Sequence, residues 1–213
     1  MRVFSCGDLI QRISVADLTA GGDADFAAML DGRQAVVYSD PPWSPGNEKW
    51  WRRHAGEKPP ESYDRLLDAW CRCAVAARPE HVVVEQSVKP EHKQMLLDAI
   101  ARCRGWALPL AEEWVALYGS PKRPNAVLHF GHEKLTTNPS GLSGEPMTRT
   151  VFCGLRQLGA LSCGMVADPC TGLGMTSRMA HEFGLAFVGT ELNAARLDKT
   201  IGWLLSHGYA EDA

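Results

Sequence analysis

Asp40, Pro41, Pro42 and Trp43 place an acid, two rigid residues and an aromatic ring in one short segment. The residues just before them, 35–38, are apolar and partly β-branched, which predicts a buried strand. Two prolines end that strand, because neither can donate a backbone hydrogen bond. The acid and the ring are then held at a strand's carboxyl end, where open α/β sheets bind ligands. Acceptors beside a stacking surface suit a planar ring with an exocyclic amine. A strand-ending turn with a buried tryptophan is the alternative interpretation.

A second segment of interest covers residues 165–176. An apolar strand leads into Asp168, then into a turn that contains Gly172 and Gly174, and then into a helix. Glycines let a ligand approach the backbone closely, and a helix start offers free N–H groups. The next strand ends in Glu191, about 20 residues beyond the turn, a spacing that suits an acid accepting hydrogen bonds from ribose hydroxyls. The pattern predicts a site for an adenosyl ligand. A plain strand–helix–strand unit with Glu191 as a cap is the alternative.

The segment 44–61 is predicted to form a long loop with a basic and aromatic centre. Trp50, Trp51, Arg52 and Arg53 lie at this centre. Arginines contact phosphates, and indole rings stack on unpaired bases. We therefore expect this loop to face a nucleic-acid substrate. The alternative is a surface loop whose tryptophans pack back onto the domain.

The composition is that of an ordinary globular protein, with 45% hydrophobic and 22% charged residues among 213. This length predicts one domain over 1–213 with a full core. The net charge of −3 gives no global basic field, so nucleic acid would need a local patch. Without a secretory core or an apolar run near ~18 residues, we expect a cytoplasmic protein with no membrane partner. The seven cysteines are expected to be reduced and mostly buried, and no metal site is predicted.

Periodicity and turn residues predict the other elements. The predicted strands cover residues 2–6, 81–85, 113–118, 126–130 and 186–191, with a hairpin loop over 120–125. The predicted helices cover 26–30, 62 to near 79, 90 to near 105, 147–158, 177–183 and 193–205, and a brief helical pattern covers 9–13. Asp8 is interpreted as the cap of that brief helix. The alternation predicts an α/β fold with one doubly wound, mostly parallel sheet and a terminal antiparallel hairpin.

The two motifs together resemble the amino-methyltransferases, which methylate the exocyclic nitrogen of adenine or cytosine in nucleic acids. Residues 40–43 are similar to their Asp-Pro-Pro-aromatic tetrad. Residues 168–174 are similar to their Asp-Pro-Phe-x-Gly-x-Gly turn, with Cys170 in place of Phe. The order, with the tetrad first, resembles the permuted β group of DNA methyltransferases with its Rossmann-like fold. Trp43 and residues 131–133 also resemble the mRNA adenine methyltransferase family.

The resemblance implies S-adenosyl-L-methionine as the cofactor and assigns roles to named residues. The implied catalytic residues are Asp40, Pro41, Pro42 and Trp43. The implied cofactor-binding residues are Asp8, Asp40, Asp168, Pro169, Cys170, Thr171, Gly172, Gly174, Met175, Thr176, Glu191, Leu192 and Asn193. The implied substrate-binding residues are Trp43, Trp50, Trp51, Arg52 and Arg53. Asp8 enters this set because Gly7-Asp8 resembles a Gly-Asp pair whose acid lies near the cofactor's adenine. Residues 145–146 and the helix after them resemble a segment that helps enclose the methionine moiety.

The implied reaction is methylation of N6 of adenine in DNA, with N6 methylation of adenine in RNA as the alternative. The base must leave its stack to reach the methyl group. Trp43 would stack on it, while Asp40 and the Pro41 carbonyl would accept its amine hydrogens. Two other classes stay open: a non-catalytic nucleic-acid-binding partner of the same fold, and an enzyme acting on a protein amide or small amine.

The segment 134–147 is a second candidate for facing the substrate, and it is short. DNA members of the resembled group usually carry a recognition insertion of many tens of residues there. Reading a sequence in the major groove needs a helix or ribbon with several side chains. We therefore expect short sequence specificity, a single-stranded or RNA substrate, or recognition by a second copy of the chain or another subunit.

Overall fold

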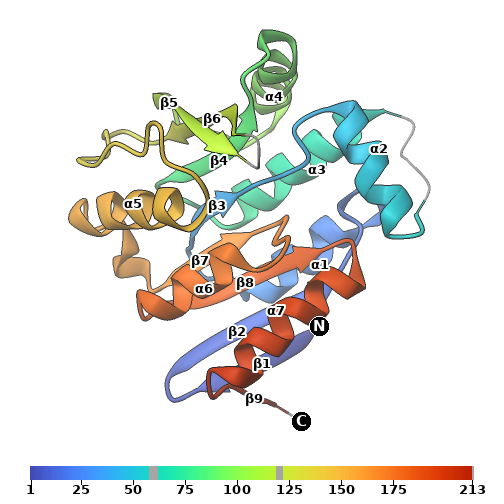
Figure 1. Cartoon of the computed structure of the whole chain (residues 1–213), viewed down its shortest axis with the longest axis vertical. Coiled ribbons are helices and arrows are strands. Elements are labelled where there is room, and N and C mark those ends of the chain that lie inside the picture. Colours follow the sequence, from blue (N-terminus) through green and yellow to red (C-terminus); the bar gives the residue numbers. More distant parts are fainter. Residues whose placement is uncertain (58–61, 119–121, 213) are drawn as a thin grey trace.

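One mixed sheet runs through the computed structural model, which describes residues 1–57, 62–118 and 122–212 (Figure 1). Its strands in these residues are β1 (Arg2–Cys6), β2 (Leu9–Val15), β3 (Val36–Ser39), β4 (Val82–Ser87), β5 (Leu110–Tyr118), β6 (Arg123–Phe130), β7 (Met165–Asp168), β8 (Ala186–Glu191) and β9 (Ala210–Glu211). They lie in the order β5-β6-β4-β3-β7-β8-β2-β1-β9. The strands from β4 to β2 in this order are parallel, and antiparallel strands flank them on both sides. The predicted α/β class and the β5–β6 hairpin are confirmed.

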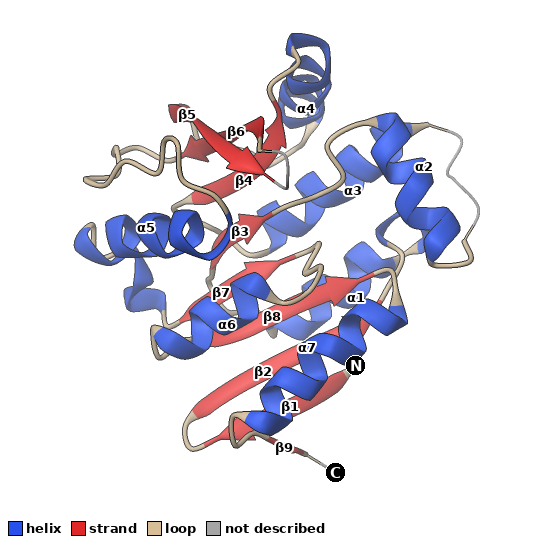
Figure 2. Ribbon diagram, in the orientation of Figure 1, coloured by secondary structure: helices blue, strands red, loops and turns tan. Residues whose placement is uncertain are grey.

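Helices cover both faces of the sheet (Figure 2). They are α1 (Gly22–Leu30), α2 (Pro45–His54), α3 (Tyr63–Ala76), α4 (Pro90–Arg102), α5 (Gly144–Gln157), α6 (Met175–Glu182) and α7 (Ala194–Ser206), with short 3-10 helices at Leu18–Ala20 and Ala160–Cys163. α1, α3 and α4 pack on one face around Trp70, and α5, α6 and α7 pack on the other around Phe152. Because both faces are covered, β3 and β7 are fully buried and read as continuous rather than alternating apolar runs. None of the helices in the described residues has the length and apolar character of a membrane span.

The connections that follow β3 and β7 run to opposite sides of this strand pair. The chain leaves β3 through α3 to β4 on one side, and leaves β7 through α6 to β8 on the other. β3 and β7 are themselves hydrogen-bonded neighbours, with Val36 opposite Val166 and Val37 opposite Ala167. Such a switch point opens a crevice beyond the carboxyl ends of the two strands. The segments that follow β3 and β7 both begin at this crevice.

The brief helix predicted over 9–13 is wrong, because these residues form β2. Gly7 and Asp8 make a two-residue turn that pairs Cys6 with Leu9, and Gly7 has a φ of 57°. A two-residue Gly-Asp loop between strands is a hairpin signal, since glycine reaches positive φ without strain. Asp8 therefore lies in a turn and caps no helix.

The long loop predicted over 44–61 is also wrong, because most of it is α2. The Ser44 hydroxyl accepts a hydrogen bond from the Asn47 N–H at 3.1 Å, and Pro45 occupies the first turn. Serine at the cap and proline at the first helical position are the usual start of a helix. Residues 58–61 of the predicted loop, and residues 120–121 of the predicted hairpin loop, lie outside the described residues.

The other predicted elements are present with small shifts at their ends. α5 begins at Gly144 rather than 147, and α6 begins at Met175 rather than 177. All seven cysteines are free thiols, but only Cys71 and Cys73 are buried and the rest are half-buried. His129 is a strand residue, as predicted.

Gly189 in β8 allows the glycine turn after β7 to lie close to the sheet, and Gly189→Ala should destabilise the protein. A Cβ there would overlap the Thr171 hydroxyl and come within 2.5 Å of the Phe187 ring. We expect a loss of about 2 kcal/mol in the free energy of unfolding, typical of overpacking, measured by urea denaturation. In the control Gly202→Ala, at an exposed position of α7, a Cβ meets no atom within 4 Å, so the stability should rise by up to about 1 kcal/mol. Equal stability of Gly189→Ala and wild type would contradict this account.

Candidate active site

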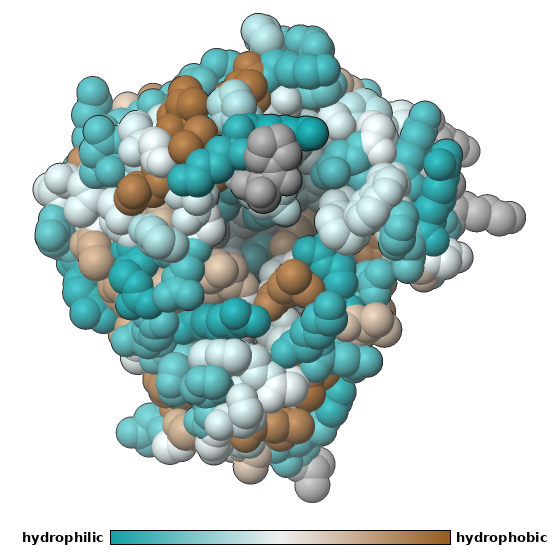
Figure 3. Space-filling view, viewed as in Figure 1, coloured by the Kyte–Doolittle hydropathy of each residue, from teal (hydrophilic) through white to brown (hydrophobic). Residues whose placement is uncertain are grey.

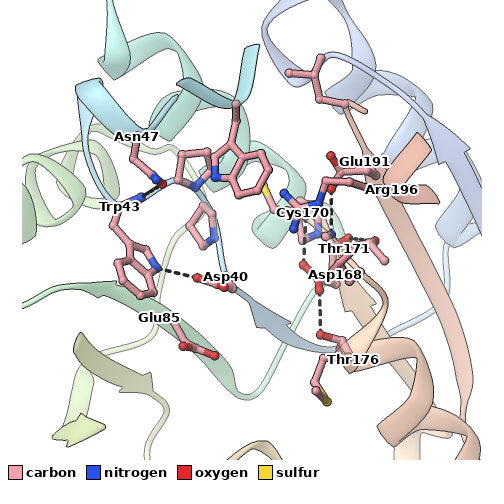
Figure 4. Close-up of a pocket in the computed structure, with 18 of the residues that line it drawn as sticks. Asp40, Trp43, Asn47, Glu85, Asp168, Cys170, Thr171, Thr176, Glu191 and Arg196 are labelled. Carbon is pink, nitrogen blue, oxygen red and sulfur yellow. Dashed lines mark hydrogen bonds between the residues drawn. The ribbon is translucent and has the colours of Figure 1, made fainter. Parts of the chain in front are cut away.

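A cavity of about 280 Å³ lies at the carboxyl ends of the parallel strands, and the space-filling view shows the surface hollowed there (Figure 3). It is lined by the segments that follow β2, β3, β7 and β8, and by parts of α2, α3, α5 and α7. The tetrad 40–43 and the turn 168–173 line the same cavity. Figure 4 shows the tetrad on one side and the glycine-turn residues on the other. The expectation that the two motifs meet in one crevice agrees with this geometry.

Trp43 is fixed at three points. Its indole Nε1–H donates to Asp40 Oδ1 at 2.5 Å, and its backbone N–H donates to Asn47 Oδ1 at 3.1 Å (Figure 4). Its ring meets the Tyr118 ring edge-on, with centroids 4.6 Å apart and planes at 75°. The ring and the carboxyl are therefore held in a defined relation to each other.

The two proline carbonyls of the tetrad differ. The Pro42 carbonyl accepts a hydrogen bond from the Tyr63 hydroxyl on α3. The Pro41 carbonyl has no hydrogen-bond partner in the described part of the chain. It therefore keeps its acceptor capacity at the cavity, next to the Asp40 carboxyl.

Asp168 organises the glycine turn. Its Oδ1 accepts from the Cys170 N–H at 2.9 Å, and its Oδ2 accepts from the Thr176 hydroxyl at 2.7 Å. One carboxyl thus ties the end of β7 to the first turn of α6. Burial raises the pKa of Asp168 to about 7.

Glu191 connects the turn to the end of β8. Its Oε2 accepts from the Gly172 N–H at 2.8 Å, and its Oε1 accepts from the Asn193 N–H at 2.9 Å. Gly172 and Gly174 have φ values of 61° and 79°, which favour glycine. A Cβ on Gly174 would overlap Thr200. Both glycines are therefore required by conformation, and Gly174 is required by space as well.

A second acid, Glu85 on β4, lines the cavity near Asp40. The Tyr38 hydroxyl donates to its Oε1 at 2.9 Å, and the Asn125 amide donates to its Oε2 at 2.8 Å. Burial is the main cause that raises the pKa of Glu85. The Asp40 carboxyl opens onto the cavity, but surrounding protein displaces much of its water, and this effect together with the charge of Glu85 raises the pKa of Asp40.

The structure does not bring Asp8 to the cavity. β2 runs parallel to β8, and Asp8 comes just before the first residue of β2. Asp8 therefore lies at the amino ends of the parallel strands, whereas the cavity lies at their carboxyl ends. The acid at the cavity edge after β2 is Asp17. Its two carboxyl oxygens accept from Arg52 Nη1 at 2.7 Å and Nη2 at 2.9 Å.

The substrate-binding assignment requires Arg52 to be exposed, but its side chain is buried. Its side chain is 3% exposed and also donates to Glu48 Oε1 at 3.1 Å. Glu48 and Asp17 balance its charge inside the protein, so it holds the Asp17 carboxyl in place instead of meeting phosphates. Trp51 also faces the cavity, where the Arg196 guanidinium lies 3.9 Å from its ring centroid. Such a cation–π contact orients both side chains.

Most of the sequence-predicted site residues line the cavity. They are Asp40, Pro41, Pro42, Trp43, Trp51, Arg52, Asp168, Pro169, Cys170, Thr171, Gly172, Met175, Thr176, Glu191 and Leu192. Asn193 instead caps α7, where its side chain accepts from the Ala195 and Arg196 N–H groups. Trp50 and Arg53 lie on the exposed face of α2.

The sequence interpretation missed Asp17, Glu85, Tyr118 and Arg196 at the cavity. Asp17 follows β2 as Asp40 follows β3, so assigning the strand correctly would have found it. Arg196 lies in the first turn of α7, just after Glu191. Glu85 ends the predicted strand 81–85, so the signal that marks the other acids marks it too, although the interpretation gave it no role. Tyr118 reaches the cavity from β5, and no local sequence signal marks it.

Neither a protein-family model nor a curated protein matches this sequence. Solved structures do share its fold. M1.HpyAVI in complex with SAM matches with a TM-score of 0.60 and 15% identity, over 91% of this chain and 98% of that chain. TTHA0409 from Thermus thermophilus, a proposed DNA modification methylase, matches with a TM-score of 0.52 and 18% identity, over 93% and 96%. The cytosine-N4-specific PvuII DNA methyltransferase matches with a TM-score of 0.51 and 12% identity, over 90% and 85%. At these identities the likeness shows a common fold.

Asp168→Asn should change how stability depends on pH. The pKa of Asp168 is about 7 in the folded protein and about 3.9 in an unfolded chain. Between these values the folded state binds more protons, so this group makes stability fall as pH rises. Asparagine removes that contribution. The free energy of unfolding of the variant, relative to that of wild type, should therefore rise by on the order of 3 kcal/mol as the pH goes from 4 to 8. Urea denaturation across this range measures it, with exposed Asp198→Asn as the control. A constant difference at every pH would contradict the assigned cause.

Proposed function

We propose that this protein is an S-adenosyl-L-methionine-dependent methyltransferase acting on N6 of adenine in DNA. The observation that carries the proposal is the single cavity lined by the Asp40 tetrad and the glycine turn after Asp168. One motif offers acceptors beside a ring, and the other offers a backbone cradle. The shared fold with M1.HpyAVI, TTHA0409 and PvuII DNA methyltransferase supports the class of reaction.

The residues on the glycine-turn side fit the cofactor. Gly172 brings backbone close to the cavity without a side chain, and Glu191 has acceptor capacity left for ribose hydroxyls beyond the two N–H groups it already binds. Asp40, Glu85 and Asp168 make the cavity acidic, which suits a cationic ligand. S-adenosyl-L-methionine would supply a methyl group activated by a positively charged sulfonium. Two proteins of this fold, M1.HpyAVI and TTHA0409, have been solved in complex with it.

The tetrad side holds the base. A base inside a duplex cannot reach the cavity, so it must leave its stack. The free oxygen of Asp40 and the Pro41 carbonyl accept the two amine hydrogens, and this draws the nitrogen lone pair away from the ring. The Trp43 face supports the base. Positioning and acceptor electrostatics therefore carry the rate, and no strong base is needed.

α2 gives the nucleic acid a surface beside the cavity. Asn47, Glu48, Trp51 and Arg52 line the cavity from one side of this helix. Lys49, Trp50 and Arg53 lie on its exposed side, and Trp50 is 47% exposed. Two cations and an indole ring suit contacts with phosphates and an unpaired base.

Mass analysis of nucleosides tests the proposal directly. DNA and RNA, each single- and double-stranded, are incubated with the protein and isotope-labelled cofactor, then digested to nucleosides. Labelled N6-methyladenine from DNA is the expected product. Labelled N4-methylcytosine, or labelled adenine only from RNA, would correct the substrate. No label in any nucleic acid would favour a non-catalytic binding partner of the same fold.

Asp40→Ala should abolish transfer and leave cofactor binding nearly unchanged. The variant loses the carboxyl acceptor for the amine but keeps the glycine turn and Glu191. We expect kcat to fall by about 100-fold or more, with the cofactor Kd by calorimetry within a few-fold of wild type. The matched variant Glu191→Ala should instead weaken cofactor binding first. Methylation retained by Asp40→Ala would reject the assigned role.

Replacing Lys49 and Arg53 together by alanine should reduce the salt dependence of DNA binding. The slope of log K against log salt is negative, and each lost phosphate contact reduces its magnitude by about 0.9 on duplex DNA and about 0.7 on single strands. Fluorescence anisotropy over a salt series measures the slope. Arg33 and Arg104, exposed residues away from α2, serve as the matched control pair. An unchanged slope in the Lys49/Arg53 variant would exclude α2 as the phosphate-contacting surface.

A further inference from the structure

The aromatic residue of the tetrad does more here than offer a flat face. Among the aromatic side chains of an Asp-Pro-Pro-aromatic tetrad, only tryptophan carries an N–H donor on its ring. That donor is used, because Trp43 Nε1 lies 2.5 Å from Asp40 Oδ1 (Figure 4). The indole cannot swing freely, since Tyr118 packs against its ring and Asn47 holds its backbone N–H.

Asp40 has a specific need for such a donor. Since Oδ1 already accepts from Trp43, a proton on the carboxyl would lie on Oδ2 and turn that oxygen into a donor, so Oδ2 can accept an amine hydrogen fully only when the carboxyl is ionised. Burial and the nearby Glu85 carboxyl both favour the protonated form of Asp40. A hydrogen bond from Trp43 favours the ionised form, and so does the positive charge of Arg196.

The hydrogen bond from Trp43 also gives the two carboxyl oxygens of Asp40 different roles. Oδ1 is directed at the indole N–H, so the carboxyl plane is fixed and Oδ2 is left for another donor. Tyr63 occupies the Pro42 carbonyl and leaves the Pro41 carbonyl as the neighbouring acceptor. Two acceptors, one from each of two adjacent residues, match the two hydrogens of a primary amine.

We propose that Trp43 is a positioning residue for Asp40, whose indole N–H keeps that carboxylate ionised and oriented toward the substrate amine. This inference rests on the proposed function and adds a second role to the stacking of Trp43 on the base. The two roles are separable, because phenylalanine keeps a ring face and loses the N–H.

The test compares Trp43→Phe with wild type in kcat against pH, using saturating DNA and cofactor. Without the N–H, Asp40 should hold its proton to higher pH. We expect the acid limb of the kcat profile to move up by about one pH unit, so that kcat falls about tenfold below the limb. The KM for DNA should stay within a few-fold, because the ring face remains. Trp203→Phe, at a half-buried tryptophan of α7 that does not line the cavity, is the matched control.

Adding Glu85→Gln to Trp43→Phe should move the limb back toward lower pH. Glutamine keeps the shape and an oxygen that accepts from Tyr38, and its NH2 group can donate to the unpaired Asn125 Oδ1 when the Asn125 amide turns over. It removes the like charge that opposes ionisation of Asp40. This rescue separates an electrostatic role from a structural one. A limb that stays in place in Trp43→Phe while kcat falls at every pH would overturn the inference and leave stacking as the only role.

An NMR measurement tests the same hydrogen bond without depending on enzymatic activity. The indole N–H proton of Trp43 should give a downfield NMR signal that titrates with Asp40 and moves upfield in Asp40→Asn. A signal that ignores both pH and that substitution would overturn the inference even if the enzyme is active. Transfer absent from wild type at every pH would overturn the proposed function, whatever the indole signal shows.

Discussion

The pairing of β3 with β7 is the contact on which the candidate site depends. These strands lie far apart in the sequence, yet Val36 and Val37 pair with Val166 and Ala167 near the centre of the sheet. The crossovers to β4 and β8 run in opposite directions, and right-handed connections therefore place α3 and α6 on opposite faces. Neither helix covers the ends of β3 and β7. The tetrad and the glycine turn are thus exposed to the same crevice by topology, before any side chain contributes.

The cavity brings several carboxyl groups close together, although such an arrangement is unfavourable for the stability of the fold. Asp40, Glu85 and Asp168 all have raised pKa values, with loss of hydration as the largest cause. Placing acids in a site with little water is unfavourable unless something compensates. Hydrogen bonds from Tyr38, Asn125 and Thr176 compensate in part. The remaining imbalance is characteristic of functional sites, and it gives the cavity a preference for donors and cations over anions.

Local sequence patterns predicted most of the parallel core, because each buried strand is a continuous apolar run ended by an acid. Those acids, Asp40, Asp168 and Glu191, were therefore found. β2 was missed because the half-buried pattern over residues 9–15 resembles a short helix when the Gly7-Asp8 turn is not recognised. The cofactor role of Asp8 came instead from the resemblance of Gly7-Asp8 to a Gly-Asp pair, whereas the acid that lines the cavity after β2 is Asp17. Glu85 ends the predicted strand 81–85 in the same way, but the interpretation gave it no role. Tyr118 could not be predicted, because its approach to the cavity depends on how β3, β4, β6 and β5 pair across the sheet.

α2 shows why composition cannot by itself identify a binding surface. Its basic and aromatic residues suggested a single substrate-facing loop, but a helix divides neighbours between opposite sides. Arg52 turns inward to Glu48 and Asp17, whereas Arg53, the next residue, is exposed. The inward side also reaches the tetrad, because Asn47 accepts the Trp43 backbone N–H. One short helix therefore joins the exposed cations to the residue that holds Asp40. The charge that would draw a nucleic acid and the geometry that would receive its base are thus set by the same element.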